Sequence, residues 1–337
     1  MSASNGTREE SKALPSRAAP ASGRAPAAAG YPAMPVTLVL PFPLGGSTGY
    51  TATVLAGELQ TLLGQPFTVE AKNGNYGINA MQHLVDNADG YTLLVGNLTS
   101  NSMTPVLHRE RMGFDYRHEI LPVSRVAEFP SVVMTQPFFP ADTLAGFLAH
   151  LKKSSGKLVY GTDFLGAYVD VDAIALGEAS GLEVAYHATD GASGILADLV
   201  AGRIDVAFLN AATASANVGK FKPLAVFGPC RLANFPNAPT MAEAGFEGIG
   251  TGNWQGLFAP RRTPSAIAHL LHRSVVAAMS TDNAKAAFRS VDARITTSVS
   301  PEAFAAEIEA EMVKWRRMIP QIMALPRADR RERALHT

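Results

Sequence analysis

The segment Val36-Thr-Leu-Val-Leu-Pro-Phe-Pro-Leu-Gly-Gly-Ser-Thr-Gly49 decides the fold that the sequence predicts. Its first five residues are apolar or β-branched, which is typical of a buried strand over Val36–Leu40. A loop rich in proline and glycine follows, and then a helix from about Thr51 to Leu63, whose leucines recur along one stripe. Gly64 stands where helices commonly end. This strand, loop and helix predict the opening unit of an α/β fold.

The loop between this strand and its helix has the composition of an anion site. Gly45 and Gly46 would let the backbone come close to a ligand, and Ser47 and Thr48 supply hydroxyl donors. The free N–H groups and partial positive charge of the helix terminus would point back at the loop. The sequence therefore predicts that this loop holds a carboxylate. The alternative is a tight turn with an N-cap, which needs fewer glycines and hydroxyls than are present.

The same residues also satisfy a hydrolase pattern. Gly45-Gly-Ser-Thr-Gly49 matches G-x-S-x-G between a strand and a helix, where a nucleophilic serine, here Ser47, would stand. Pro41 and Pro43 indicate a wide loop instead of the sharp turn that this motif requires, and the eight histidines have no catalytic signature around them. A serine hydrolase therefore stays an alternative to a binding protein, and it is the least favoured one.

The remainder of the chain alternates short apolar runs with helical patterns, which predicts two α/β units with parallel sheets. The further predicted strands are 67–69, 92–95, 121–126, 131–135, 157–160, 183–187, 204–209 and 222–227. The further predicted helices are 78–85, one that Asp142 caps and that reaches Leu151, 171–180 and 193–201. Past Gly256 the pattern becomes mostly helical, with helix starts at Thr263-Pro264 and Ser300-Pro301.

Two more polar loops follow predicted strands. Asn97-Leu-Thr-Ser100 comes after the strand at 92–95, and Gly161-Thr-Asp-Phe-Leu-Gly-Ala167 comes after the strand at 157–160. In open parallel sheets, ligands bind beyond the carboxyl ends of the strands. The sequence therefore predicts a cleft between two α/β units, in which these loops face the first one.

Composition excludes several functional classes. The chain of 337 residues has 29 basic and 29 acidic side chains, so its formal net charge is zero and we expect no nucleic-acid-binding surface. A single cysteine excludes an intrachain disulfide and a cysteine-rich zinc site. No apolar run reaches the ~18 residues of a membrane-spanning helix. No phosphate-loop or dinucleotide motif is present, and we expect neither a cofactor nor a metal.

Both ends of the chain differ in composition from the rest. Residues 1–34 are rich in alanine and proline without hydrophobic periodicity, which predicts a disordered tail. The same residues lack the apolar core of a secretory signal. The arginine-rich residues 326–337 are predicted to form a second, solvated tail.

A series of short motifs, in order along the chain, carries a family resemblance. They are Pro41-Phe-Pro-Leu-Gly-Gly46, Asp89-Gly-Tyr-Thr-Leu-Leu94, Pro122-Val-Ser124, Gly156-Lys-Leu-Val-Tyr-Gly161, Asp198–Asp205, Leu224-Ala-Val226, Pro239–Gly245, Gly256–Pro260 and Lys314-Trp315. They span the chain from about Pro35 to Ile319. In these motifs the sequence resembles the solute-binding proteins of the tripartite tricarboxylate transporter system, the Bug family.

The resemblance implies a type II periplasmic-binding-protein fold, α/β in class, with two lobes and a ligand cleft between them. Lobe 1 would comprise residues 35–131 and 257–325, and lobe 2 would comprise residues 132–256. Backbone N–H groups and hydroxyls of the first loop would hold a carboxylate. The implied ligand-binding residues are Leu44, Gly45, Gly46, Ser47, Thr48, Gly49, Asn97, Thr99, Ser100, Thr162, Asp163, Gly166 and Ala167.

The implied function is capture of a small carboxylate in the periplasm and its delivery to the membrane permease subunits of a tripartite transporter. A monomer without catalytic residues is expected. A sensor role, in which the liganded protein docks on a kinase, is an alternative. It would use the same form of the protein, in which the lobes have closed over the ligand. An aspartate and an arginine that are usual in the family are replaced here by Gly49 and Thr53, which favours a plain carboxylic acid over an amino acid as the ligand.

Overall fold

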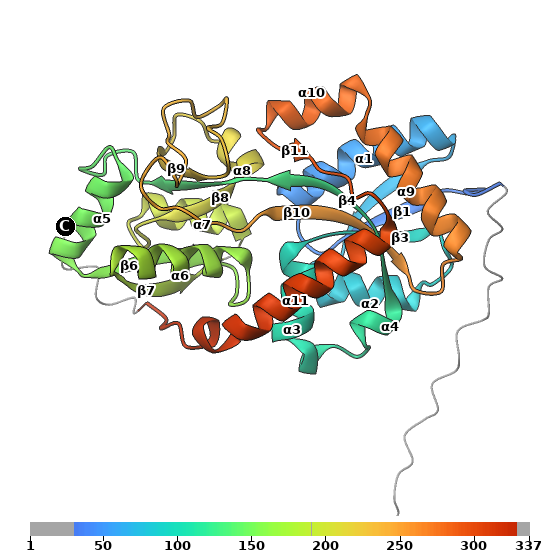
Figure 1. Ribbon diagram of the computed structural model, residues 1–337, viewed down its shortest axis with the longest axis horizontal. Helices are drawn as coiled ribbons and strands as arrows, with labels where there is room; N and C mark the ends of the chain where they lie inside the picture. The colour runs from blue at the N-terminus through green and yellow to red at the C-terminus, as the bar shows by residue number, and fades with distance from the viewer. Residues whose placement is uncertain (1–29, 190, 329–337) are drawn as a thin grey trace, which may run out of the picture.

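The computed structural model describes residues 30–189 and 191–328, which form two lobes side by side (Figure 1). Lobe 1 contains residues 30–129 and most of the described residues from 253 onward, and lobe 2 is built mainly from the residues between them (Figure 1). The fold is mixed α/β and two-lobed, as predicted.

Lobe 1 is built on a six-stranded sheet with the strand order β11-β4-β10-β3-β1-β2. Its strands are β1 (Val36–Leu40), β2 (Phe67–Ala71), β3 (Thr92–Asn97), β4 (Ile120–Phe129), β10 (Asn253–Pro260) and β11 (Arg294–Ile295). β1 is parallel to β2 and β3, but β10 is antiparallel to β3 and β4, and β11 is antiparallel to β4. The prediction of a parallel sheet is therefore wrong for β10 and β11. β10 runs in the opposite direction because the chain returns from lobe 2 at this strand, and β11 follows α10 and pairs with β4 at the edge of the sheet.

The centre of this sheet is the main departure from the sequence-based prediction. Every residue of β10 is buried, so the strand shows no alternation of polar and apolar residues. The prediction that the chain becomes helical after Gly256 is therefore wrong for the residues up to Pro260, which belong to β10. The next helix begins at Ser265.

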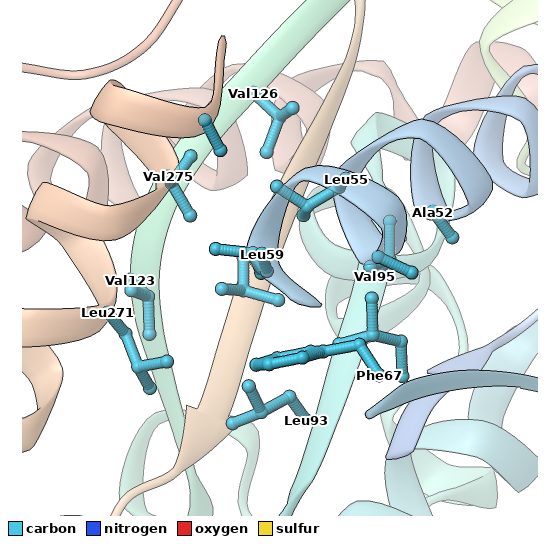
Figure 2. Close-up of a cluster of buried hydrophobic side chains, with 14 of the residues drawn as sticks. Ala52, Leu55, Leu59, Phe67, Leu93, Val95, Val123, Val126, Leu271 and Val275 are labelled. Carbon is cyan, nitrogen blue, oxygen red and sulfur yellow. The ribbon is translucent and has the colours of Figure 1, made fainter. Parts of the chain in front are cut away.

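Helices cover both faces of the lobe 1 sheet. They are α1 (Ser47–Leu63), α2 (Ile78–Asp86), α9 (Ser265–Met279), α10 (Asp282–Ser290) and α11 (Pro301–Met323), with short helices at α3 (Thr104–Leu107) and α4 (Tyr116–Glu119). Leu55 and Leu59 of α1 meet Leu271 and Val275 of α9 above the sheet (Figure 2). Each fully buried leucine contributes about 1.5–3 kcal/mol to the free energy of unfolding relative to an exposed one. Leu38 of β1 and Leu93 of β3 belong to the same cluster, so the burial of these leucines holds α1 against both strands.

Lobe 2 has two smaller sheets. One is β8-β5-β9, from Ala207–Asn210, Ser131–Thr135 and Lys222–Phe227, and the other pairs β6 (Lys157–Thr162) with β7 (Glu183–Ala188). A bridge between Tyr160 and Val206 joins them. The helices of this lobe are α5 (Leu144–Ser154), α6 (Tyr168–Ser180), α7 (Gly191–Val200) and α8 (Ala211–Ser215).

Three segments connect the lobes. β4 continues through Pro130 into β5, and the chain returns through Thr251 and Gly252 into β10. The third connection follows α11, where Pro326 O accepts from Tyr186 N at 3.0 Å and Ala328 N donates to Tyr186 O at 2.8 Å. Residues 326 and 327 are exposed, as predicted, but residues 326–328 do not form a free tail, because they extend the β6–β7 sheet.

The N-terminal tail also ends earlier than predicted. Tyr31 is buried in the lobe 1 core, and its hydroxyl donates to Gly90 O at 2.8 Å. The prediction of disorder is wrong from Gly30 onward, and residues 1–29 lie outside the described residues. Across residues 30–189 and 191–328, no helix has both the length and the apolar character needed to cross a membrane.

Candidate functional site

The loop after β1 leads into α1 earlier than predicted. The helix begins at Ser47 instead of Thr51, and Gly46 is its N-cap with an extended backbone. Ser47, Thr48 and Gly49 therefore form the first helical turn, whose N–H groups have no partner inside a helix. Within the described residues, none of these three amides donates a hydrogen bond. They are available to an anion beside Gly46.

The two hydroxyls of this turn belong to a buried network. Thr48 Oγ1 donates to Gln255 Oε1 at 2.8 Å and accepts from Asn97 Nδ2 at 3.1 Å. Gln255 Nε2 also contacts Ser47 Oγ at 3.3 Å and Asn253 Oδ1 at 3.3 Å. The structure thus brings together the predicted Ser47, Thr48 and Asn97. Sequence reasoning missed Gln255, because the strand that carries it was not predicted.

This network bears on the hydrolase alternative. Ser47 is buried, and its side-chain partner among the described residues is the amide of Gln255. A nucleophilic serine needs an adjacent base to take its proton, and a carboxamide cannot do so. The geometry contains no catalytic pair at the G-x-S-x-G match.

The second loop is a self-contained turn. Ser100 N donates to Asn97 Oδ1 at 2.9 Å, and Asn97 N donates to Ser100 Oγ at 3.0 Å. Ser100 is fully buried, so its role is to shape the turn that positions Asn97. Thr99 Oγ1 accepts from Tyr168 N of lobe 2 at 3.2 Å, which joins this loop to the opposite lobe.

In the lobe 2 loop, some of the expected donors already have partners. The amides of Gly166 and Ala167 donate to Asp170 Oδ2 at 2.6 and 3.0 Å, and Tyr160 donates to the other carboxylate oxygen at 2.6 Å. Burial raises the pKa of Asp170 to about 6, although these hydrogen bonds oppose the shift. Gly166 and Ala167 therefore do not offer free amides to a ligand, contrary to the expectation. The signal for this was an acidic residue at the third position of the following helix.

The remaining predicted residues of this loop lie at its start. Thr162 is buried and its hydroxyl donates to Phe164 O at 2.9 Å. Asp163 is exposed, with its Oδ1 3.5 Å from Thr189 Oγ1.

Four rings from both lobes meet beside these loops, and we call them the mouth cluster: Phe42, Tyr76, His108 and Phe164. Phe164 of lobe 2 lies 6.5 Å from the Phe42 centroid and 5.0 Å from the Tyr76 centroid, and Tyr76 stacks on His108 at 3.8 Å. His108 Nε2 lies 3.1 Å from Leu165 O, so it can donate across the lobes. Burial lowers the pKa of His108, which keeps the ring neutral. These contacts hold the two lobes together.

Gly49 is the tightest point of the first loop. A Cβ atom at this position would lie 2.1 Å from Leu44 O, which is backbone and cannot rotate away. At Gly45 or Gly46, in contrast, a Cβ would meet no heavy atom within 4 Å. The loop thus packs on Gly49 and leaves open space beside Gly45 and Gly46.

Residues 51–323 match the family model described as the tripartite tricarboxylate transporter family receptor, TctC. The chain belongs to this family. The match begins just after the first loop, so that loop is known from the structure rather than from the family model. As a member of TctC the chain is a substrate-binding receptor and not an enzyme, as the sequence predicted.

Relatives and solved structures of the TctC family cover nearly the same residues. BugT of Bordetella pertussis (strain Tohama I) is 29% identical over 290 residues, which cover 85% of this chain and 88% of BugT. The R. palustris protein Rpa4515 with adipate has a TM-score of 0.80 at 28% identity, over 88% of this chain and 99% of that one. MatC of Rhodopseudomonas palustris with bound malate has a TM-score of 0.75 at 26% identity, over 86% and 100%. These neighbours confirm the two-lobed binding-protein fold.

Removing the Phe164 ring should open the protein. Phe164→Ala deletes three ring pairs between the lobes, each worth about 0.5–1.5 kcal/mol, so the unliganded variant should shift toward an open form. Small-angle scattering should then show a larger radius of gyration than for the wild-type protein. Phe138→Ala, at a side chain that is 94% exposed, is the matched control and should leave the radius unchanged. Equal radii for all three proteins would contradict a closing role for the mouth cluster.

Proposed function

We propose that this protein captures a small carboxylate between its lobes in the periplasm and delivers it to the permease of a tripartite tricarboxylate transporter. The observation that carries the proposal is the set of three unpartnered amides of Ser47, Thr48 and Gly49 at the start of a long helix. Family membership and the two solved structures with adipate or malate support the ligand class. The solved structures of a periplasmic transporter and of the periplasmic binding protein BugD support the location.

The carboxylate would lie in the open space beside Gly45 and Gly46. There the amides of the first helical turn and the positive end of the helix dipole both favour a negative charge. Asn97 and Gln255 hold the Thr48 hydroxyl in place, so the turn is ordered before the ligand arrives. Lobe 2 would close over the ligand with Thr162 and Phe164. A preformed site of this kind binds with a smaller loss of conformational entropy.

A plain carboxylic acid fits this site better than an amino acid. An ammonium group would need an acidic partner, and the position suited to one is Gly49, where Leu44 O excludes any side chain. We therefore expect mono- or dicarboxylates without an ammonium group to be preferred over the matching amino acids.

The test is a thermal-shift panel of mono-, di- and tricarboxylates, each with its methyl ester. At ~100-fold above Kd, the bound acid should stabilise the fold by ~2.7 kcal/mol, which raises Tm by several degrees. The esters should have no effect, because they lack the negative charge that the amides recognise. Gly46→Val should lose the shift, because its side chain would fill the space beside the amides. Equal shifts with acids and esters would refute the proposed carboxylate site.

A further inference from the structure

A second hollow lies between the lobes, away from the loops described above, and we call it the hinge hollow. It has a volume of about 390 Å³. One wall is the segment 229–233, which follows β9 of lobe 2, and the other is formed by α10 and residues 292–295 of lobe 1 (Figure 1). Pro130, where β4 passes into β5, lies at its base. The volume falls within the range of small-molecule sites in proteins.

Two cationic side chains on one wall of the hinge hollow have no partner. Lys285 and Arg289 are four residues apart on α10, so they share one face of the helix. Both side chains are exposed, and neither makes an ion pair or side-chain hydrogen bond within the described residues. The other two arginines of the lining are paired, Arg231 with Glu243 and Arg294 with Glu128. Like charges at this spacing disfavour the helix unless an anion lies between them.

The single acidic side chain of the lining does not neutralise these cations. Asp292 accepts from the amides of Ala233 and Asn234 at 2.8 and 3.0 Å, so its carboxylate is bound to lobe 2. Its backbone has a φ of 54°, which is unusual for a residue with a side chain. Asp292 thus joins the two walls, and within the described residues it makes no ion pair with Lys285 or Arg289.

The rest of the lining is largely apolar. Pro229, Cys230 and Ala233 of the lining are exposed, and Ile295 is half-buried. An inorganic ion would leave this surface uncovered. An occupant that satisfies both features carries a negative group for Lys285 and Arg289 and an apolar body for the surface around Pro229 and Ile295.

We propose that the hinge hollow is a second ligand site, for a small organic anion with an apolar body. Because its walls belong to different lobes and meet at Pro130, the fit of such a ligand depends on the angle between the lobes. A ligand here and a ligand between the polar loops are therefore coupled, and each changes the affinity of the other by the same factor.

The experiment uses anilinonaphthalene sulfonate, an aromatic sulfonate whose fluorescence rises on binding. Cys230 lines the hollow and is exposed, so its reaction with neutral N-ethylmaleimide reports on occupancy. The probe should slow this reaction at the concentrations at which it binds. The double variant Lys285→Gln/Arg289→Gln should bind the probe at least tenfold more weakly and lose the protection of Cys230.

The double variant Arg316→Gln/Arg317→Gln is the matched control, because it removes the same net charge from exposed positions on α11. It should bind the probe like the wild-type protein. If bound probe leaves the reaction of Cys230 unchanged, or if both double variants bind equally well, the hinge hollow is not an anion site. Neither readout depends on the carboxylate site, so failure there would leave this result standing.

Discussion

Gly49→Ala should abolish carboxylate binding, although the substitution adds a single methyl group. Its Cβ would lie 2.1 Å from Leu44 O, so residues 43–46 must move away from the helix. This movement displaces the backbone that lines the anion space, and we expect affinity to fall by roughly a hundredfold or more, about 2.7 kcal/mol. Overpacking should also lower the free energy of unfolding by about 1–3 kcal/mol. Titration calorimetry with the acid identified by thermal shift, together with urea unfolding, measures both effects.

Gly57→Ala is the control on the same helix, because a Cβ there meets no heavy atom within 4 Å. It should raise the free energy of unfolding by about 0.5–1 kcal/mol, since alanine favours helix more than glycine does, and leave affinity unchanged. If Gly49→Ala bound the acid as tightly as Gly57→Ala, the first loop would not carry recognition.

The second large effect concerns Asp172, a fully buried carboxyl group of α6 at the return crossing between the lobes. Its Oδ1 accepts from Thr251 N at 2.8 Å, and within the described residues its Oδ2 has no hydrogen-bond partner. Burial raises the pKa of Asp172 from 3.8 to about 7. The folded state therefore holds a proton that the unfolded chain releases above about pH 4.

It follows that this group destabilises the fold as pH rises from about 4 to 7. With about 1.4 kcal/mol per pKa unit, the effect is on the order of 4 kcal/mol at neutral pH and above. Asp172→Asn keeps an acceptor for Thr251 N and does not titrate. The free energy of unfolding of the variant, relative to wild type, should therefore increase by several kcal/mol between about pH 5 and pH 8.

Urea unfolding at a series of pH values checks this, with the exposed Glu247→Gln as the control, which should track the wild-type protein. Comparing each variant with wild type removes the contribution of other titrating groups, among them Asp170. A constant difference between Asp172→Asn and wild type across this range would show that the carboxyl group is ionised in the fold.

An element can be predicted from the sequence where one local pattern dominates. It cannot be predicted where complete burial removes the alternation of polar and apolar residues. β1 and the loop after it combine an apolar run with a proline- and glycine-rich break, so both were predictable. β10 is buried along its whole length, and its pattern resembles that of a buried helix until its pairing is known. Gln255 could not be assigned to the site for that reason, although it orders both hydroxyls of the first turn.

The lobe 2 loop shows a different limit. Its glycines and its place after a strand suggest an anion site as strongly as those of the loop after β1. In the structure, however, the carboxylate of Asp170 accepts from the amides of this loop, so the anion comes from within the chain. The acidic residue at the third position of α6 was the one signal for this in the sequence, and the structure shows that its carboxylate does accept from both amides. Lys285 and Arg289, in contrast, resemble in sequence any pair of exposed helical charges.

The position of β10 also governs how the chain can fold. Asn253 pairs with Phe129 and Gln255 with Asn97, so the central strand of lobe 1 is made by residues that follow the whole of lobe 2. Until they arrive, β3 and β4 are two open edges with no strand between them, and such edges invite pairing with other chains. The chain between β4 and β10 must be brought together as one long loop before these strands can pair, and such long-range pairing makes folding slow. Lobe 1 therefore cannot complete its sheet ahead of lobe 2 during synthesis, and its folding waits until the chain has been made as far as Pro260.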